Sequence, residues 1–333
     1  MAASATSHLL KRLARSLGRG TDALEDARRE LRWMKQALHS PPKGIKPDAK
    51  SLEEMVERRV RNEPIQYILG SVPFGTRLEL ACRRPVLIPR PETEDWALKL
   101  ASVLRAQASP ARPLRILDLC TGTGCIPLLL CAELPPGSVR ATGVDISEAA
   151  VQLSAENARI NGIAVSGGPG LAPAKNDKQE NTFTPVLADL MDPDFVNRAG
   201  LEPPYDVITS NPPYIPLTEY EALDSSVRDW EDPRALLGDP VSSSPAAPSV
   251  PDAHLNKGLA FYHRIAALVR GHGLLAPDGW LALEVGDGQA EEVGEIVRRG
   301  TALRAVATWE DPYGKRRAVV ARREGVCEEP SHY

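Results

Sequence analysis

The sequence predicts an α/β protein with a doubly wound, mostly parallel sheet that ends in an antiparallel hairpin and follows a small helical domain. Two observations lead to this prediction. From residue 113 onward, short apolar segments of strand length alternate with segments of helical periodicity, which is the pattern of a parallel sheet with crossover helices. The last two strand-length segments have no helix between them, so we expect them to pair antiparallel.

Composition and charge exclude several classes of function. The chain has 333 residues, and its 40 Lys and Arg side chains against 44 Asp and Glu give a formal net charge of −4. Tight, non-specific wrapping of nucleic acid is disfavoured, because it depends on a strong basic field. The densest apolar stretch, Ile126 to Cys131, is far shorter than the roughly 18–20 residues of a membrane span.

The cysteines and histidines do not indicate a metal site. The five cysteines are scattered and none forms a C-x-x-C pair, so we expect free thiols in a reducing compartment rather than disulfides or a metal cluster. The six histidines show no ligand spacing, and His263 is expected to be a surface or core residue.

The first 20 residues are basic and contain no acid. Lys11, Arg12, Arg15 and Arg19 lie among frequent Ser and Ala residues, and leucines recur at helical spacing. This profile is typical of a mitochondrial transit segment, so residues 1–20 predict a location in the mitochondrial matrix. The alternative is a basic first helix of the folded domain.

A small helical domain is expected next, over residues 21–85. Apolar residues of 21–64 recur at steps of three and four, as on one face of a helix. Ser51 with Glu54 three residues later forms a capping box that should begin a second helix. Because so short a domain can hardly hold a core alone, we expect it to pack on the larger α/β domain, residues 86–325.

The α/β domain is expected to alternate strands with helices. Strands are expected at 114–119, 139–146, 186–190, 206–210, 280–285, 303–309 and 317–322. Helices are expected at 126–134, 147–161, 259–270 and 289–299. Ser147 can cap the second of these helices and Gly162 can end it. Two segments rich in Gly, Pro, Ser and Ala, 165–185 and 239–256, predict flexible surface insertions.

The first strand of this domain runs directly into a glycine loop. The loop reads Asp118-Leu-Cys120-Thr121-Gly122-Thr123-Gly124, and its glycines let the backbone approach a ligand closely. Asp145 ends the next strand, where an acid can accept hydrogen bonds from both hydroxyls of a ribose. The combination predicts a nucleoside-type cofactor, without separating NAD from S-adenosylmethionine (AdoMet). A tight strand-to-helix turn is the alternative.

Asn211-Pro212-Pro213-Tyr214 directly follows the strand expected at 206–210. Proline fixes its own φ and holds the residue before it extended, and it has no N–H, so carbonyls are the available backbone polar groups. The Asn211 side-chain oxygen and the Pro212 carbonyl could each accept one proton of a planar NH₂ group, while Tyr214 covers one face of that group. Such a clamp would align the nitrogen with a methyl group on sulfur and stabilise its growing positive charge. A rigid turn after a strand is the alternative.

Over about residues 50–325 the sequence resembles the HemK/PrmC family, the N5-glutamine methyltransferases of peptide-chain release factors. The resemblance is carried by Glu63-Pro-Ile-Gln-Tyr67-Ile-Leu-Gly70, Val86-Leu-Ile-Pro-Arg90-Pro-Glu92-Thr93-Glu94, Ile116-Leu-Asp-Leu119, Asn211-Pro-Pro-Tyr214, Ala235-Leu-Leu-Gly238, Gly258-Leu-Ala-Phe-Tyr262 and Leu283-Glu284-Val-Gly286. Asn-Pro-Pro-Tyr is shared with amino-methylating nucleic-acid enzymes, whereas the segment 88–94 is specific to the family. With the basic leader, the chain resembles the mitochondrial member.

The resemblance implies a Rossmann-like class I AdoMet-dependent methyltransferase domain behind a helical domain that docks the substrate. The implied reaction is methyl transfer to the N5 atom of the glutamine in the Gly-Gly-Gln loop of class I release factors, by a monomer that uses no metal and binds neither membrane nor DNA. Residue by residue, Cys120–Gly124 match the AdoMet loop with Asp118 before it, Asp145 the ribose acid, Leu190 the adenine-lining position, and Asn211–Tyr214 the amide clamp, with Asn211 also contacting the cofactor.

Three departures from the family pattern bear on cofactor binding. Cys120 replaces the first glycine of the loop, Leu190 stands where relatives usually have an aromatic residue, and the insertion 239–256 interrupts a compact stretch. Further candidate pocket residues are Arg90, Glu92 and Glu94. The alternative for these three is a helix that Thr93 caps, with the acids in its first turn.

Two other functions stay open at this point. An adenine-N6 or cytosine-N4 nucleic-acid methyltransferase would use the same clamp, but the chain shows no basic, aromatic-rich segment suited to base recognition. A non-catalytic binding protein with the methyltransferase fold would fit the departures at Cys120 and Leu190.

Overall fold

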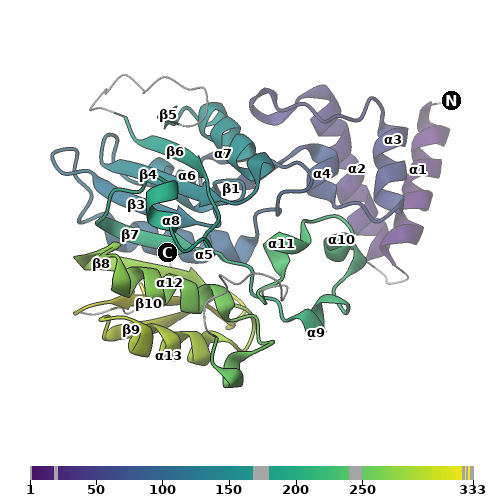
Figure 1. The fold of residues 1–333 in the computed structure, drawn as a ribbon. Coiled ribbons are helices and arrows are strands. Elements are labelled where there is room, and N and C mark those ends of the chain that lie inside the picture. The colour runs from purple at the N-terminus through teal and green to yellow at the C-terminus, as the bar shows by residue number, and fades with distance from the viewer. Residues whose placement is uncertain are drawn as a thin grey trace.

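The computed structural model describes residues 2–18, 22–167, 180–239, 250–324, 327, 329 and 330. A large sheet with helices on both faces forms the body of the molecule, and the helices α1–α4 form a bundle beside it (Figure 1). Across the sheet the strands follow the order β5, β6, β4, β3, β7, β8, β10, β9. All run parallel except β10, which is antiparallel to both β8 and β9, so the predicted fold class is confirmed.

Most strands of this sheet lie close to the expected positions. The two-residue strand at 164–165 was not expected, one strand was expected too late, and the strand expected at 280–285 begins at Leu275. They are β3 Leu114–Leu119, β4 Val139–Asp145, β5 Ala164–Val165, β6 Thr182–Leu187, β7 Tyr205–Ser210, β8 Leu275–Glu284, β9 Ala305–Glu310 and β10 Arg316–Arg322. The strand expected at 186–190 was placed too late. It is β6, and most of it lies inside the segment expected to be an insertion. Proline at position 185 hid the strand, because a proline argues against a central strand, although the burial of these residues alternates.

Helices cover the two faces of the sheet in separate groups. On one face lie α5 Pro91–Leu104, α6 Cys125–Glu133 and α7 Glu148–Ile160; on the other lie α8 Phe195–Arg198, α12 Ala260–Gly271 and α13 Ala290–Gly300. Successive residues of a strand serve opposite faces. Trp280 of β8 is buried in the core that contains α5 and α6, whereas Leu281 is buried in the core that contains α12 and α13.

The bundle at the N-terminal side has a small core of its own. Its helices are α1 Ala2–Leu17, α2 Ala23–His39, α3 Leu52–Val60 and α4 Ile65–Leu69, with the short 3₁₀ turn η1 Pro42–Gly44 after α2. Met34, Met55 and Ile68 are fully buried between them. The Ser51 side chain accepts a hydrogen bond from the Glu54 N–H, as the capping box predicts, but the Glu54 carboxylate accepts from the Lys50 N–H instead of that of Ser51.

Helix α1 packs into this bundle. Leu9 and Leu13 are buried against α2 and α3, and Arg12 lies 4.0 Å from Glu57 of α3. This arrangement is the one that a first helix of the folded domain would show. The transit role of residues 1–20 stays a prediction.

The range expected to be helical, 21–85, also contains a hairpin that the sequence analysis missed. Strands β1 Ser71–Phe74 and β2 Leu78–Ala81 pair antiparallel outside the main sheet. The side-chain oxygen of Asn157 in α7 accepts from the Ala81 N–H at 2.7 Å, and the Asn157 amide donates to the Thr123 carbonyl at 3.0 Å. The hairpin therefore fixes the bundle to the α/β domain close to the glycine loop.

Several short elements lie outside the expected pattern. They are α9 Leu217–Tyr220, α10 Ser225–Arg228, α11 Pro233–Leu236 and the 3₁₀ turn η2 Asp252–His254. None is long enough for helical periodicity to reveal it. Residues 168–179 and 240–249, the middle parts of the two expected insertions, lie outside the described residues. In the part of the chain that the structure describes, no helix has the length and hydrophobicity to cross a membrane.

Candidate functional site

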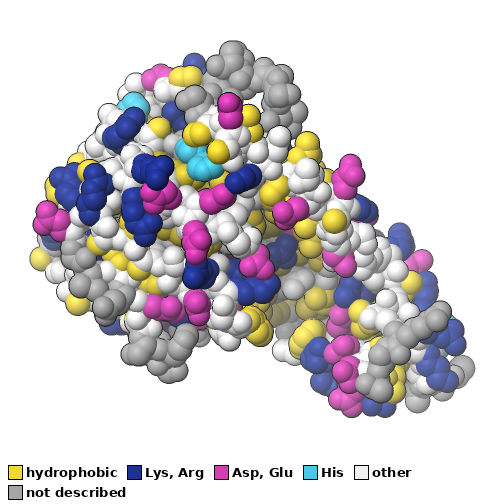
Figure 2. All heavy atoms as spheres, turned by 90° about the horizontal axis from the view of Figure 1, so that it is seen from below, with side chains coloured by type: hydrophobic (Ala, Val, Ile, Leu, Met, Phe, Trp, Pro, Cys, Tyr) yellow, Lys and Arg dark blue, Asp and Glu magenta, His cyan; other side chains and the backbone are white. Residues whose placement is uncertain are grey.

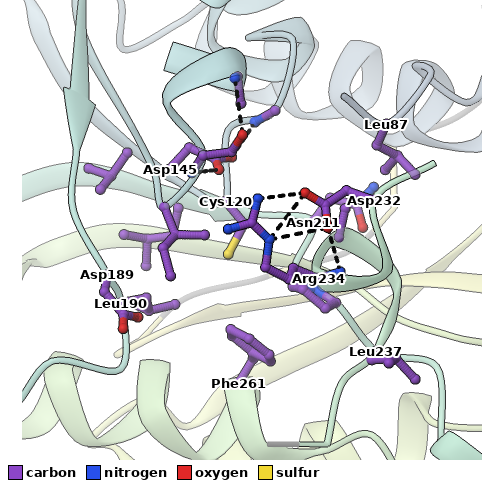
Figure 3. Close-up of a pocket in the computed structure, with 18 of the residues that line it drawn as sticks. Leu87, Cys120, Asp145, Asp189, Leu190, Asn211, Asp232, Arg234, Leu237 and Phe261 are labelled. Carbon is purple, nitrogen blue, oxygen red and sulfur yellow. Dashed lines mark hydrogen bonds and ion pairs between the residues drawn. The ribbon is translucent and has the colours of Figure 1, made fainter. Parts of the chain in front are cut away.

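A cavity of about 380 Å³ opens beyond the carboxyl ends of β3, β4 and β7 (Figure 3). This is where open parallel sheets bind ligands. Of the residues that the sequence singles out, its lining includes Cys120, Gly122, Asp145, Leu190, Asn211 and Pro213. Segments far apart in the chain thus meet at one site, as the motif positions predict.

The glycine loop turns sharply at the rim of this cavity. Gly122 and Gly124 have φ values of 54° and 79°, and Cys120 has a φ of 59°, in the left-handed region that favours glycine. The Thr121 N–H donates to the Val144 carbonyl at 3.0 Å, which ties the loop to β4. Thr121 and Thr123 are buried and do not line the cavity, so they shape the loop from behind.

Asp118 lies beneath the loop and not in the cavity. It is fully buried, and its Oδ1 atom accepts a 2.6 Å hydrogen bond from the Thr209 hydroxyl of β7. Burial raises the pKa of Asp118 to about 7, against the effect of neighbouring threonine hydroxyls. In this geometry Asp118 joins β3 to β7 under the loop.

The Asp145 carboxylate lines the cavity, and backbone N–H groups fix its position. Its Oδ2 atom accepts from the Gly122 N–H and its Oδ1 atom accepts from the Ser147 N–H, each at 2.8 Å. A carboxylate oxygen can accept about two hydrogen bonds, so each oxygen keeps capacity for one more donor. Burial raises the pKa of Asp145, and the two backbone donors oppose this rise. The pair of oxygens suits two adjacent hydroxyls.

The opposite end of the cavity is bordered by the apolar side chains of Leu190 and Phe261, with Asp189 beside them. Leu190 is buried in the wall, and its carbonyl accepts a 2.8 Å hydrogen bond from Arg264 of α12. Phe261 of α12 points into the same space (Figure 3). Phe261 was not among the predicted site residues, although it lies in the Gly258–Tyr262 motif. An aromatic ring therefore borders the cavity even though position 190 carries leucine.

Asn211 stands on the cavity wall directly after β7. Its Nδ2 atom donates to the Thr93 hydroxyl at 3.3 Å. Pro212 and Pro213 are both buried, and Pro213 also lines the cavity. Tyr214 does not line the cavity; burial, with Glu284 nearby, raises the pKa of its phenol.

Glycines of three family motifs surround the backbone of Tyr214. A β-carbon on Gly238 would lie 2.7 Å from the Tyr214 Cα, and one on Gly258 would overlap the Tyr214 carbonyl. A β-carbon on Gly286 would lie 3.0 Å from the Tyr214 ring. The Gln289 amide donates to the Tyr214 carbonyl at 2.9 Å. These contacts fix the chain at the end of the Asn211–Tyr214 turn.

The segment 88–94 does not line the cavity. Helix α5 begins at Pro91 with Arg90 as its N-cap residue and acids in its first turn, as the alternative for this segment had it, except that Thr93 lies inside the first turn and not at the cap. Arg90 forms a 2.5 Å ion pair with Glu231, whose side chain is fully buried. Burial raises the pKa of Glu231, and Arg90 opposes this rise. Neither Arg90 nor either nearby glutamate, at 92 and 94, lines the cavity.

Two further residues that line the cavity were not predicted from the sequence. Asp232 and Arg234 border the cavity and form a forked pair, with Nη2 of Arg234 2.7 Å from Oδ2 of Asp232. Figure 3 shows Arg234 directed into the cavity between Asp145 and Asn211. A sequence signal was available, because α11 contains the first two residues of the Ala235–Gly238 motif, but nothing in the spacing shows that α11 folds over the cavity.

The described residues contain no cluster of three or more His, Cys, Asp or Glu side chains able to hold a metal ion. His263 gives no indication of a metal site either. It is half-buried and lies 2.9 Å from His254, ring nitrogen to ring nitrogen.

The residues that line the cavity fit AdoMet. The apolar end suits an adenine, the Asp145 oxygens suit the ribose hydroxyls, and the left-handed glycine loop allows close approach of a ligand to the backbone. The sheet order, the antiparallel last hairpin and this cavity define an AdoMet-dependent methyltransferase of the Rossmann-like class I type.

Comparison with known proteins gives the family. The sequence model described as the PrmC N-terminal domain matches residues 20–70. The release factor glutamine methyltransferase of Rhodospirillum rubrum is 34% identical over 276 residues, which are 83% of this chain and 70% of that protein. That of Bacteroides thetaiotaomicron is 32% identical over 82% of this chain and 81% of that protein. This chain belongs to the release factor glutamine methyltransferase family.

A mitochondrial relative is similarly close. The mitochondrial MRF1 N(5)-glutamine methyltransferase MTQ1 of Saccharomyces cerevisiae is 33% identical over 219 residues, 65% of this chain and 60% of that protein. A solved structure of the release factor-specific protein-(glutamine-N5) methyltransferase of Alicyclobacillus acidocaldarius is 25% identical over 72% of this chain and 95% of that chain, with a TM-score of 0.38.

Proposed function

We propose that this protein transfers a methyl group from AdoMet to the side-chain amide nitrogen, N5, of the glutamine in the Gly-Gly-Gln motif of peptide-chain release factors, and that its substrates are mitochondrial release factors. Membership of the release factor glutamine methyltransferase family supports the acceptor class. The observation that supports the reaction most directly is the position of Asn211, on the wall of the cavity that Asp145 also lines.

Two features of the turn support the proposed clamp. The Nδ2 atom of Asn211 donates one of its two protons to Thr93, and the side-chain oxygen can accept a proton of a substrate amide. The Pro212 carbonyl belongs to the peptide unit between Pro212 and Pro213, and Pro213 lines the cavity. Neither proline has an N–H, so no backbone donor of these two residues would compete with the substrate amide for an acceptor. Together the two oxygens would accept the two protons of a glutamine NH₂ group.

When bound, AdoMet supplies an electrophilic methyl group on a sulfonium. The glutamine nitrogen would use its lone pair to form the new N–C bond, the S–C bond would break, and the surplus proton would then leave the nitrogen for solvent. Asn211 and Pro212 hold the two amide protons, whose positive charge grows as the bond forms, so the clamp binds the transition state more tightly than the ground state. Alignment of the two reactants would contribute much of the rate, because it can lower a barrier by roughly 7–11 kcal/mol.

The mitochondrial assignment has two supports. The first 20 residues are basic and free of acids, and the yeast mitochondrial enzyme is 33% identical over 65% of this chain. Bacterial relatives are equally close in sequence, so the acceptor class is better supported than the compartment.

The surface charge gives no support to the rival acceptor, an amino group of a nucleic acid. Figure 2 shows Lys and Arg side chains interspersed with Asp and Glu over the visible face, and the net charge is −4. A duplex-modifying enzyme would need a field of one sign to hold phosphates.

The test is incubation of the full chain with AdoMet and a recombinant mitochondrial release factor, followed by mass spectrometry of its tryptic peptides. We expect a gain of one methyl group, about 14 Da, on the Gly-Gly-Gln glutamine and none when that glutamine is replaced by alanine. Transfer of labelled methyl groups to DNA, with the release factor unmodified, would overturn the proposal.

A further inference from the structure

We infer that Thr93 and Glu284 are positioning residues for methyl transfer: a hydrogen-bond relay from Glu284 through Thr93 fixes the Asn211 amide with its oxygen toward the substrate. The inference rests on the proposed function and adds to it two residues outside the Asn211–Tyr214 turn. Neither Thr93 nor Glu284 lines the cavity, so each acts through Asn211.

The relay begins at a buried carboxylate. Glu284 is the last residue of β8 and 2% exposed. Its Oε2 atom accepts hydrogen bonds from Trp96 Nε1 at 2.8 Å and from the Thr93 hydroxyl at 2.6 Å. An indole N–H can only donate, so Oε2 is an acceptor in this pair of contacts, although burial raises the pKa of Glu284. The single hydroxyl proton of Thr93 is therefore directed at Glu284.

This direction decides how Asn211 can approach Thr93. Because the hydroxyl proton of Thr93 is donated to Glu284, the Thr93 oxygen can only accept a further hydrogen bond. It accepts one from the NH₂ group of Asn211, at 3.3 Å. Turning the amide over would bring two lone-pair-bearing oxygens together without a proton between them. The relay thus disfavours the flipped amide, in which an NH₂ group would face the two donors of the glutamine amide.

The fold explains why these residues meet. Strands β7 and β8 are neighbours, with Ser210 opposite Leu283, so the next residues, Asn211 and Glu284, lie side by side at this end of the sheet. Thr93 reaches both from the first turn of α5, which packs across this end of the sheet. A buried carboxylate without such partners would be costly, which argues that Glu284 serves a purpose here.

A purely structural role for Glu284 makes a different prediction. In that case the carboxylate would only hold α5 on the sheet, through Trp96 and Thr93 alike. Loss of either donor would then lower stability and leave the rate of methyl transfer per folded molecule unchanged. The relay requires that only Thr93 matters for the rate.

The experiment compares Thr93→Val, Thr93→Ser and Trp96→Phe in the full chain. Measured for each are the single-turnover rate at saturating AdoMet, the AdoMet dissociation constant by calorimetry and the melting temperature. We expect Thr93→Val to lower the rate about tenfold with little change in the dissociation constant, the size of effect that loss of one hydrogen bond produces. Thr93→Ser should keep the rate, and Trp96→Phe should lower the melting temperature while keeping the rate.

Equal rates for Thr93→Val and Thr93→Ser would overturn the relay, as would a Trp96→Phe enzyme that loses rate as much as Thr93→Val. The Asn211→Ala variant separates this failure from that of the proposed function. If Asn211→Ala abolishes transfer while Thr93→Val does not, the clamp stands and the relay falls. If Asn211→Ala transfers methyl groups at the normal rate, the clamp itself is wrong.

Discussion

Gly258 lies against the carbonyl of Tyr214 so closely that a β-carbon at position 258 would overlap that oxygen. The same carbonyl accepts a hydrogen bond from Gln289 at 2.9 Å. A glycine 44 residues away in sequence (258 minus 214) thus fixes where the Asn211–Tyr214 turn ends. This contact gives a physical reason for a glycine whose role the sequence pattern leaves open.

Replacing Gly258 with alanine should displace the turn and impair transfer. We expect turnover to fall about a hundredfold, the loss that a misplacement of roughly 1 Å can cause. Gly258 has a φ of 71°, so the matched control is Gly273→Ala, at a φ of 57° with no atom within 4 Å of the added carbon. The control should lose about 1 kcal/mol of stability and keep its turnover per folded molecule. Similar turnover for the two variants would contradict the account.

Asp145→Ala should weaken cofactor binding. Both carboxylate oxygens have capacity left after the Gly122 and Ser147 N–H groups are satisfied, so removing them deletes two acceptors from the cavity. We expect the AdoMet dissociation constant, measured by calorimetry, to rise about tenfold to a hundredfold. Asp278→Ala, at an exposed carboxylate, is the control. An unchanged dissociation constant for Asp145→Ala would refute the ribose assignment.

Asp118 should make stability depend on pH. Burial raises its pKa to about 7, whereas an unfolded chain has a value near 3.9. Between these values the folded state binds more protons than the unfolded state, so the contribution of Asp118 to stability is lost as pH rises through 7. Asp118→Asn cannot titrate. Its free energy of unfolding relative to wild type should therefore increase by roughly 2–3 kcal/mol from about pH 5 to about pH 8.

Denaturant unfolding at the two pH values measures this change. Asp278→Asn removes a carboxylate from the surface and serves as the control. If the free energies of unfolding of Asp118→Asn and wild type differ by the same amount at both pH values, Asp118 does not carry the predicted proton.

Helix α1 should contribute to the stability of the full chain. Leu13 is fully buried between α1, α2 and α3. We expect Leu13→Ala to lower the free energy of unfolding by about 2–4 kcal/mol, as a buried leucine does, while Lys11→Ala on the exposed face changes it by less than about 0.5 kcal/mol. Equal effects would mean that residues 1–20 are not part of the core, as a removable leader requires.

The α/β core was predictable because its signals are local. Leu114–Leu119, the glycine loop and Asp145 form one continuous strand–loop–helix–strand pattern, and the turn at Asn211 follows its strand directly. The topology rule that ligands bind beyond the carboxyl ends of strands then brought Asp145 and Asn211 to one cavity. These local patterns, together with the rule on where open sheets bind ligands, were therefore enough to predict where the site lies.

The rest depended on contacts that no local pattern contains. Thr93 and Glu284 are separated by 191 residues, so their hydrogen bond was invisible, and Thr93 was mistaken for a helix cap. Phe261 and Arg234 reach the cavity only because α12 and α11 fold against it. The hairpin at 71–81 was missed because its strands are only four residues long and pair outside the main sheet.

The account depends most on the Asn211 side chain as an acceptor for the substrate amide. The most direct test is the single-turnover rate of Asn211→Ala with a release factor at saturating AdoMet, alongside its AdoMet dissociation constant. We expect the rate to fall about 10²–10³-fold, as on loss of one preorganised polar group, with the dissociation constant changed far less. A rate close to that of the wild-type protein would contradict the proposed clamp.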